Sequence, residues 1–456
     1  MRMSDKTLVY AALLSICLSF GCKSKSGANG QGQTPAEVLP WIHDDYSRAI
    51  QASEAKGLPL VLDFWAAWCH TCLSMKHTVL RDPKLKEFAD DAIWVAIDTE
   101  NPVNQDMLEM HSISVWPTFL VADSKGNIAA RQLGSTSVDS FISFLKRGFK
   151  DIKSNDSKSR LAQADSEAAK GNYHEASEHY QHAMSGTPGG TTPAPESVLA
   201  WIESLHRLGR FDECAQAGQA KLDDIAKSNN ATLADFAYFL TDCQKRISSK
   251  EAEPTRNRFI ALIENLLKNR SSELSVDDRS EALKMLRSFY DQSNKTDEAQ
   301  KTAQRQKLLL DKAVKDSKTP FEAMTYSYPR LDVYSYLGVI EELIPWFKDL
   351  SQTLKNEYDP PYRLASVYSH LEQFDKALKS ADIAKARAHG PRKARICSFM
   401  ANLHSKSKHF DEAIKSQHQA IEILSKQPQT SRTAKTLKTY RTELSRLQQL
   451  QTANGN

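Results

Sequence analysis

The sequence of 456 residues lacks features that would point to several common functional classes. Beyond residue 20 it has no apolar run long enough to span a membrane. It has no basic run and no basic patch with interleaved aromatic residues, so nucleic acid is not expected as a partner. Lys and Arg number 60 against 56 for Asp and Glu, which leaves a net charge of only +4. The composition, with 40% hydrophobic and 25% charged residues, is that of a globular protein, and the length predicts two or more domains.

Cysteine is scarce, and the spacing of the seven cysteines excludes the disulfide framework of small secreted domains. Two lie near the amino terminus, two form a Cys-x-x-Cys pair, and three are isolated further along the chain. In order, they are Cys17, Cys22, Cys69, Cys72, Cys214, Cys243 and Cys397. The last three lie in helical surroundings, where each is expected to be a small buried hydrophobe rather than a reactive site. Whether these three are free thiols is left open by the sequence.

The first 21 residues have the pattern of a signal peptide. Arg2 and Lys6 precede an apolar run at 8–20, which is too short for a comfortable membrane span but typical of a signal sequence. The run ends at Gly21-Cys22, which resembles the lipobox of bacterial lipoproteins, although Ser19 and Phe20 depart from the preferred residues. This resemblance implies acylation of Cys22; the alternative is an ordinary residue beside another cleavage point. A polar tether at 22–35 follows, so we expect an exported protein held on the periplasmic side of a membrane by its lipid.

The stretch at 60–72 contains the residues with the clearest chemical signal, a Cys-x-x-Cys pair that follows an apolar segment. Residues 60–65 are typical of a buried strand, and a short connection leads to Cys69 and Cys72 at the start of a helix. The positive end of a helix favours a thiolate, so Cys69 is the expected nucleophile and Cys72 the resolving cysteine. Asp63 lies in the apolar strand, where burial would raise the pKa of its carboxyl and let it exchange a proton with Cys72. A protonated His70 would stabilise the Cys69 thiolate; alternatively, His70 is a solvated loop residue.

The alternative for the Cys-x-x-Cys pair is half of a zinc site. Zinc requires about four ligands, and no second Cys or His pair lies nearby at ligand spacing. No hydrolase triad, phosphate-binding loop or carboxylate cluster for a metal stands out elsewhere in the sequence. We therefore expect a redox site with no metal and no cofactor.

The motif between Asp63 and Cys72 resembles the thioredoxin superfamily, and 115–119 is similar to the proline segment of that family. The sequence at 77–85 resembles the branch that contains the carboxy-terminal periplasmic domain of the transmembrane thiol-disulfide interchange protein. The resemblance implies an α/β thioredoxin-like sandwich at 36–150, in which a mixed sheet lies between helices. It also implies that Trp68, Trp116 and Pro117 contact the substrate. We predict a cis bond before Pro117, and Trp116 departs from the smaller residue usual there.

The hydrophobic pattern of this domain predicts alternating helices and strands. We expect helices at 41–55, 102–110 and 138–149, a new helical start at Asp82-Pro83, and further strands at 92–97, 118–121 and 128–133. Beyond a polar hinge at 151–160, strand signals nearly vanish.

Residues 161–448 contain a recurring signature of an aromatic residue, two polar residues and a small residue. It stands at 171–176, 209–214, 372–377 and 408–413, and a degenerate copy includes 297–299. The small residues recur after 38 (176 to 214) and 36 (377 to 413) positions, near the tetratricopeptide period of about 34. The region thus resembles an all-α tetratricopeptide-like solenoid, which would bind a protein or peptide ligand, and a disordered tail is expected at 449–456.

Together, these features predict an exported thiol-disulfide oxidoreductase that reduces protein disulfides. A redox partner protein would then reduce this protein's own cysteine pair again. The rival hypothesis is an adaptor in which the helical repeats are the function and the redox domain is vestigial. The sequence leaves the substrate, the direction of electron flow and the oligomeric state open.

Overall fold

The computed structural model describes residues 38–154, 159–185, 194–228, 231–427 and 431–454. The expected signal peptide, the tether and Cys22 lie outside the described residues, as do residues 155–158 of the predicted hinge. Within the described ranges, no helix is both long enough and apolar enough to cross a membrane.

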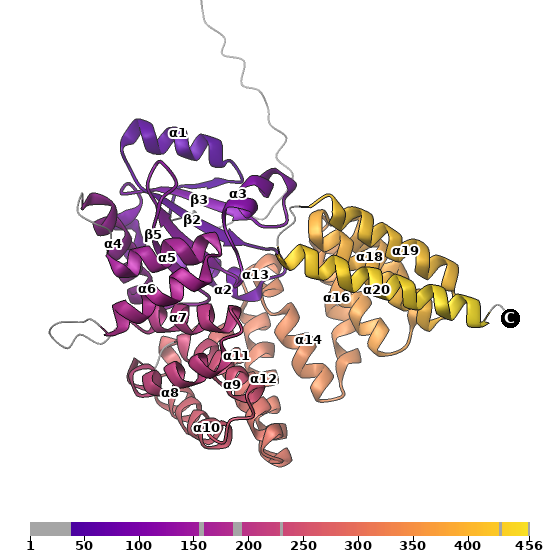
Figure 1. Ribbon diagram of the computed structural model, residues 1–456. Helices are drawn as coiled ribbons and strands as arrows, with labels where there is room; N and C mark the ends of the chain where they lie inside the picture. The colour runs from indigo at the N-terminus through magenta and orange to yellow at the C-terminus, as the bar shows by residue number, and fades with distance from the viewer. Residues whose placement is uncertain (1–37, 155–158, 186–193, 229–230, 428–430, 455–456) are drawn as a thin grey trace, which may run out of the picture. The chain divides into compact units, whose positions relative to one another are not determined.

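A five-stranded mixed sheet forms the amino-terminal part of the described chain (Figure 1). Its strands are β1 (Trp41–His43), β2 (Leu60–Trp65), β3 (Ile93–Asp98), β4 (Thr118–Ala122) and β5 (Ile128–Leu133). They lie in the order β1-β3-β2-β4-β5. β1, β3 and β2 run parallel to one another, β4 is antiparallel to β2, and β5 is antiparallel to β4. The mixed sheet confirms the predicted fold, and β2 lies at its centre because its apolar side chains are covered on both faces.

Helices cover both faces of the sheet. α1 (Tyr46–Lys56) and α3 (Gln105–Met110) pack on the face that carries Leu60, Leu62 and Phe64. α2 (His70–His77) and α4 (Val138–Lys153) pack on the opposite face, where Val61 and Phe119 lie. Short 3-10 helices complete this part, namely η1 (Val79–Arg81), η2 (Pro83–Phe88) and η3 (Pro102–Asn104). The sheet between helices is the layered arrangement that the resemblance implied.

The prediction of a helix at 41–55 is wrong for residues 41–43. Residues 41–43 form β1, which pairs with β3 in the register Trp41 to Trp94. Asp44 then adopts a φ of 53°, and Asp45 caps the amino terminus of α1 by accepting a hydrogen bond from the backbone of Arg48 at 3.0 Å. Pairing with a neighbouring strand outweighed the local helical periodicity.

The rest of the described chain is helical. The helices are α5 (Arg160–Lys170), α6 (Tyr173–Ser185), α7 (Pro195–Arg207), α8 (Phe211–Ser228), α9 (Thr232–Arg246), α10 (Ala252–Asn269), η4 (Ser271–Glu273), α11 (Val276–Gln292), α12 (Thr296–Asp316), α13 (Pro320–Met324), α14 (Ser327–Tyr336), η5 (Ile340–Leu343), α15 (Ile344–Thr353), α16 (Asp359–His370), α17 (Phe374–Arg387), α18 (Gly390–Lys406), α19 (Phe410–Ser425) and α20 (Ser431–Asn454). α20 continues to Asn454, whereas the sequence pattern predicts a disordered tail from residue 449.

The recurring signature marks the turns between paired helices. In all four copies, the residue two positions before the aromatic residue has a positive φ. These residues are Gly171 at 85°, Gly209 at 73°, Glu372 at 56° and Lys408 at 62°. The signature's small residues, which are Ala176, Cys214, Ala377 and Ala413, are fully buried. The degenerate copy follows the same plan, because Asn294 has a φ of 55° and Ala299 is buried. A left-handed residue reverses the chain, and a small buried residue lets the next helix approach closely.

The first helices of this region pack on the sheet (Figure 1). The backbone N–H of Arg131 on the edge strand β5 donates to Asp165 Oδ2 on α5 at 3.0 Å. The Arg131 guanidinium pairs with Glu203 on α7 at 3.4 Å, and both side chains are fully buried. Arg147 and Tyr180 donate to Asp165 at 2.7 and 2.6 Å. A covered sheet edge and a paired, buried charge network join the two parts of the chain.

Two of the isolated cysteines form a disulfide, which answers a question that the sequence left open. Cys214 on α8 is bonded to Cys243 on α9. Both are fully buried, as predicted, but the sequence pattern could not show that antiparallel neighbouring helices bring them together. Cys397 on α18 is a free, buried cysteine.

Candidate redox site

The Cys-x-x-Cys pair lies where β2 leads into α2. Cys69 and Cys72 are joined by a disulfide, and Cys69 is the residue that caps the amino terminus of α2. The backbone N–H of Cys72 donates to the sulfur of Cys69 at 3.0 Å. The same N–H and the helix terminus would stabilise a thiolate at Cys69 after reduction.

The two tryptophans expected to contact substrate lie against the disulfide. Trp68 and Trp116 pack with both cysteines, and the centroids of their rings are 5.6 Å apart. The bond between Trp116 and Pro117 is cis, which confirms the predicted isomer. Trp116 is held by a hydrogen bond from its indole N–H to Thr99 Oγ1 at 2.9 Å.

Asp63 is a buried carboxyl within β2. Only 2% of its surface is exposed, and its Oδ1 has no hydrogen-bond partner among the described residues. Burial raises the pKa of Asp63 from its ordinary 3.8 to about 6, although the charge of Lys76 opposes this change. A carboxyl that titrates near neutral pH is suited to exchanging a proton during disulfide chemistry.

A second carboxyl, the half-buried Asp98 at the end of β3, was missed by the sequence reasoning. It lies opposite Trp65 in the strand register, and burial raises its pKa to about 7. Its backbone N–H donates to Asp44 Oδ1 at 2.8 Å. The one sequence signal was its position directly after a buried strand beside the redox strand.

Both cysteines are covered. Cys69 is 4% exposed and Cys72 1% exposed, because α11, α13 and α14 of the helical region lie against α2. Ser74 on α2 donates to Ser275 at the start of α11 at 3.3 Å. The sequence pattern that identified Cys69 as the nucleophile gave no indication of this cover.

His70 is paired with the helical region. Its Nδ1 lies 2.7 Å from Asp277 Oδ1, its Nε2 lies 3.8 Å from Glu281 Oε1, and its ring stacks on Tyr328 at 5.6 Å between centroids. Burial favours the neutral imidazole, but the carboxylates of Asp277 and Glu281 outweigh burial and raise the pKa of His70. The structure thus contradicts the alternative that His70 is a solvated loop residue.

Glu100 binds Trp68, the residue that precedes Cys69 in the chain. The carboxylate accepts hydrogen bonds from the indole N–H of Trp68 at 3.0 Å, from the hydroxyl of Tyr358 at 2.8 Å and from Nε of Arg392 at 3.2 Å. The Arg392 guanidinium also lies 4.9 Å from the centre of a Trp68 ring. No local sequence pattern could have indicated this group, because Arg392 lies 292 positions from Glu100.

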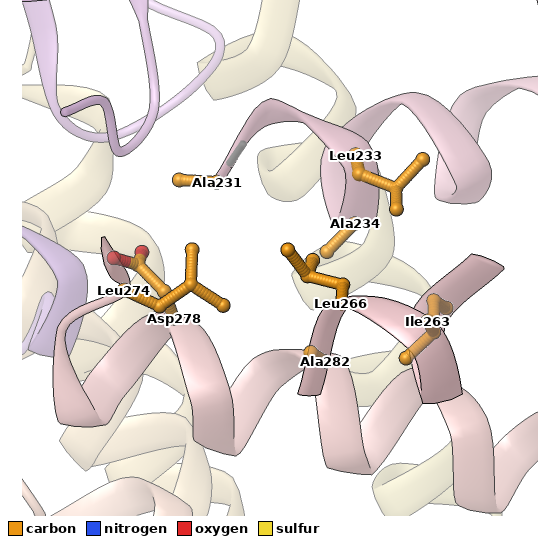
Figure 2. Close-up of a pocket in the computed structure, with 8 residues that line it drawn as sticks. All are labelled: Ala231, Leu233, Ala234, Ile263, Leu266, Leu274, Asp278 and Ala282. Atoms are coloured by element: carbon orange, nitrogen blue, oxygen red, sulfur yellow. The ribbon is translucent and has the colours of Figure 1, made fainter. Parts of the chain in front are cut away.

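The hollows of the described helical region include a small cavity and a larger groove. Figure 2 shows a small cavity between α9, α10 and α11, and its volume of about 10 Å³ leaves room for about one water molecule. A larger groove of about 450 Å³ is lined by Tyr328, Arg287, Asp332, Tyr336 and other residues of α14 and its neighbours. The described residues contain no cluster of three or more His, Cys, Asp or Glu side chains suited to holding a metal ion.

Comparison with known families agrees with the fold of the amino-terminal part. Residues 41–124 match a family model described as thioredoxin-like. This part is therefore a thioredoxin-like domain with a Cys-x-x-Cys disulfide, and a region of paired helices follows it.

The similar curated proteins include thiol:disulfide interchange proteins named DsbD. That of Escherichia coli O6:H1 is 34% identical over 108 residues, which is 23% of this chain and 19% of the relative. That of Ralstonia nicotianae is 26% identical over 106 residues, or 23% of this chain and 17% of the relative. The chain thus matches only about a fifth of the length of these relatives.

Solved structures similar to this chain include a tetratricopeptide repeat protein of Parabacteroides merdae, with 13% identity and a TM-score of 0.39 over 62% of this chain and 97% of that one. A tetratricopeptide repeat protein of Thermus thermophilus has 16% identity and a TM-score of 0.27 over 56% and 98% of the two chains.

Proposed function

We propose that this protein is an exported thiol-disulfide oxidoreductase that reduces disulfides in protein substrates. The observation that carries the proposal is the Cys69–Cys72 disulfide at the amino terminus of α2, which follows the strand that holds the buried Asp63. The thioredoxin-like match and the DsbD relatives support the same chemistry.

The reaction exchanges one disulfide for another. The Cys69 thiolate attacks a substrate disulfide, forms a mixed disulfide and releases one substrate thiolate, which takes up a proton. Cys72 then gives its proton to the Asp63 carboxylate and attacks the sulfur of Cys69. The second substrate thiolate leaves, takes up a proton, and the Cys69–Cys72 disulfide forms. The substrate gains two electrons, and a dithiol of a redox partner protein returns two electrons to this chain.

The direction of electron flow follows from the reduction potential. Similarity to the thiol-disulfide interchange branch favours a reductase, with a potential nearer that of thioredoxin, about −270 mV, than that of strong oxidants, about −120 mV. Equilibration of the full chain with glutathione buffers tests this proposal. A potential above about −160 mV would instead indicate a donor of disulfides.

For the helical region we propose a role in binding the substrate protein or another peptide partner. The groove beside Tyr328 supports this role, because Tyr328 also stacks on His70 next to the nucleophile. The rival hypothesis is an adaptor whose redox domain is vestigial. The Asp63 carboxyl, buried in the redox strand, and the disulfide argue against loss of redox chemistry.

Trapping of a mixed disulfide distinguishes the two hypotheses. The Cys72→Ser variant cannot resolve the intermediate, so a substrate should remain attached through Cys69 and be released by dithiothreitol. The matched control is Cys69→Ser with Cys72 intact, which should trap little. Absence of any Cys69-dependent adduct in cells, with the variant folded, would favour the adaptor.

A further inference from the structure

We propose that Asp277 on α11 is a positioning residue for the redox reaction, which holds His70 in its protonated form beside Cys69. The inference rests on the proposed oxidoreductase function and deepens it, because it makes the helical region a determinant of the reduction potential. Asp277 is 207 positions from His70 in the sequence, and the Nδ1 to Oδ1 distance is 2.7 Å.

Asp277 is a buried side chain at the start of a helix. Only 1% of its surface is exposed, and its Oδ2 has no hydrogen-bond partner among the described residues. It lies in the first turn of α11, where the helix dipole stabilises an anion. Ser275 and Asp278 form a capping box that begins the helix and fixes the backbone beside Asp277. A buried carboxylate in this setting is stabilised by a cationic partner, and His70 provides one.

Several charged groups surround His70, and their combined effect favours the imidazolium. The acidic groups are Asp277 and Glu281 on α11 and Asp235 on α9, whereas Lys284 on α11 opposes protonation and Tyr328 on α14 stacks on the ring. Burial lowers the pKa of His70, and the contributions of Asp277 and Glu281 raise it above its ordinary value. Asp277 is the acid in direct hydrogen-bond contact with the ring.

Removal of the Asp277 charge has two opposite consequences for Cys69. Loss of the imidazolium withdraws a positive charge and disfavours the thiolate, whereas loss of the carboxylate withdraws a negative charge and favours it. His70 directly follows Cys69 in the chain, while Asp277 is connected to the site through the His70 ring. We therefore expect the loss of the imidazolium to dominate, which raises the pKa of Cys69 and destabilises the reduced form.

A double-mutant cycle on the full chain tests the inference. In Asp277→Asn, NMR titration should show a lower pKa for His70, and alkylation against pH should show a higher pKa for Cys69. In glutathione buffers, Asp277→Asn and His70→Gln should each make the disulfide about tenfold harder to reduce, or about 30 mV more negative. In the Asp277→Asn background, His70→Gln should add less than about a twofold change, because the imidazole is already neutral.

Asp242→Asn is a matched control. Asp242 also pairs with a histidine at 2.7 Å, namely His206, but the pair joins α7 to α9 within the helical region. This variant should leave the potential of the Cys69–Cys72 couple unchanged.

The outcomes separate this inference from the proposed function. Additive effects of the two substitutions, an unchanged pKa of His70 or a fall in the pKa of Cys69 would overturn the role of Asp277 while leaving a redox enzyme. Failure of the wild-type cysteines to cycle reversibly with glutathione would overturn both.

Discussion

The hydroxyl of Tyr358, directly before α16, donates a hydrogen bond to Glu100 Oε2 at 2.8 Å, across 258 positions of sequence. Oε1 of the same carboxylate accepts the indole N–H of Trp68. Trp68 and His70, the two residues that flank Cys69, are thus both tied to the helical region, the first through Glu100 and the second through Asp277. We therefore expect that a protein disulfide reaches Cys69 only when these contacts open.

We expect loss of the Arg392 contact to expose the redox site. Arg392 pairs with Glu100 and covers Trp68, and a hydrogen bond to a charged group is worth about 1.5–3 kcal/mol. Arg392→Ala should therefore speed reduction of Cys69–Cys72 by a protein dithiol about tenfold or more, with a smaller effect on reduction by dithiothreitol. Stopped-flow tryptophan fluorescence measures both rates.

The control for this prediction is Arg446→Ala, which removes an Arg–Glu pair on the exposed side of α20. Equal acceleration by both variants would show general loosening, and no acceleration by Arg392→Ala would show that the cover does not limit access.

Cys69 should be the acidic thiol of the reduced pair. As the cap of α2 it receives the N–H of Cys72, so its apparent pKa should lie below the free value of about 8.5. Mass spectrometry after timed alkylation at a series of pH values identifies the thiol that reacts first. Faster or more acidic labelling of Cys72 would reverse the assigned roles.

Asp63 should make the oxidised protein less stable as the pH rises. Its pKa is about 6 when folded and 3.8 ordinarily, so the folded state holds the proton more tightly between these values. The free energy of unfolding should fall by up to about 3 kcal/mol from pH 4 to pH 7 through this group alone. Asp63→Asn should remove that part of the pH dependence, as urea unfolding of both proteins would show. Parallel stability curves for the two proteins would contradict the raised pKa.

The Cys214–Cys243 disulfide should stabilise the helical region. It closes a loop across a separation of 29 residues, and a crosslink of that size contributes about 2–4 kcal/mol. Replacement of both cysteines by Ala should lower the free energy of unfolding by that amount while the Cys69–Cys72 couple keeps its potential. Cys397→Ala serves as the control for loss of a buried cysteine alone. A shifted potential would show instead that this disulfide exchanges with the redox site.

The anchor prediction concerns Cys22, which lies outside the described residues. If Cys22 carries a lipid, Cys22→Ser should release the mature protein from the membrane fraction, since the polar tether supplies no apolar substitute. Fractionation in high salt, with the wild type in parallel, measures the change. Salt-resistant membrane association of the variant would contradict lipidation.

The sequence by itself determined the central strand, the helix start and the cysteine pair, because each depends on short-range patterns. An apolar run bounded by polar residues specified β2, and the cysteine spacing specified the disulfide at α2. The repeat signature specified helical turns for the same reason, since a left-handed residue and a small residue act within one turn.

Only the tertiary structure decided what surrounds the cysteines. Asp277, Tyr358 and Arg392 have no distinctive local pattern, and α11, α16 and α18 bring them to Cys69 from 208 to 323 positions away. The pairing of Cys214 with Cys243 and of β1 with β3 likewise depends on which elements become neighbours. Such contacts form when apolar faces of distant elements are buried together, and a single sequence does not display that choice.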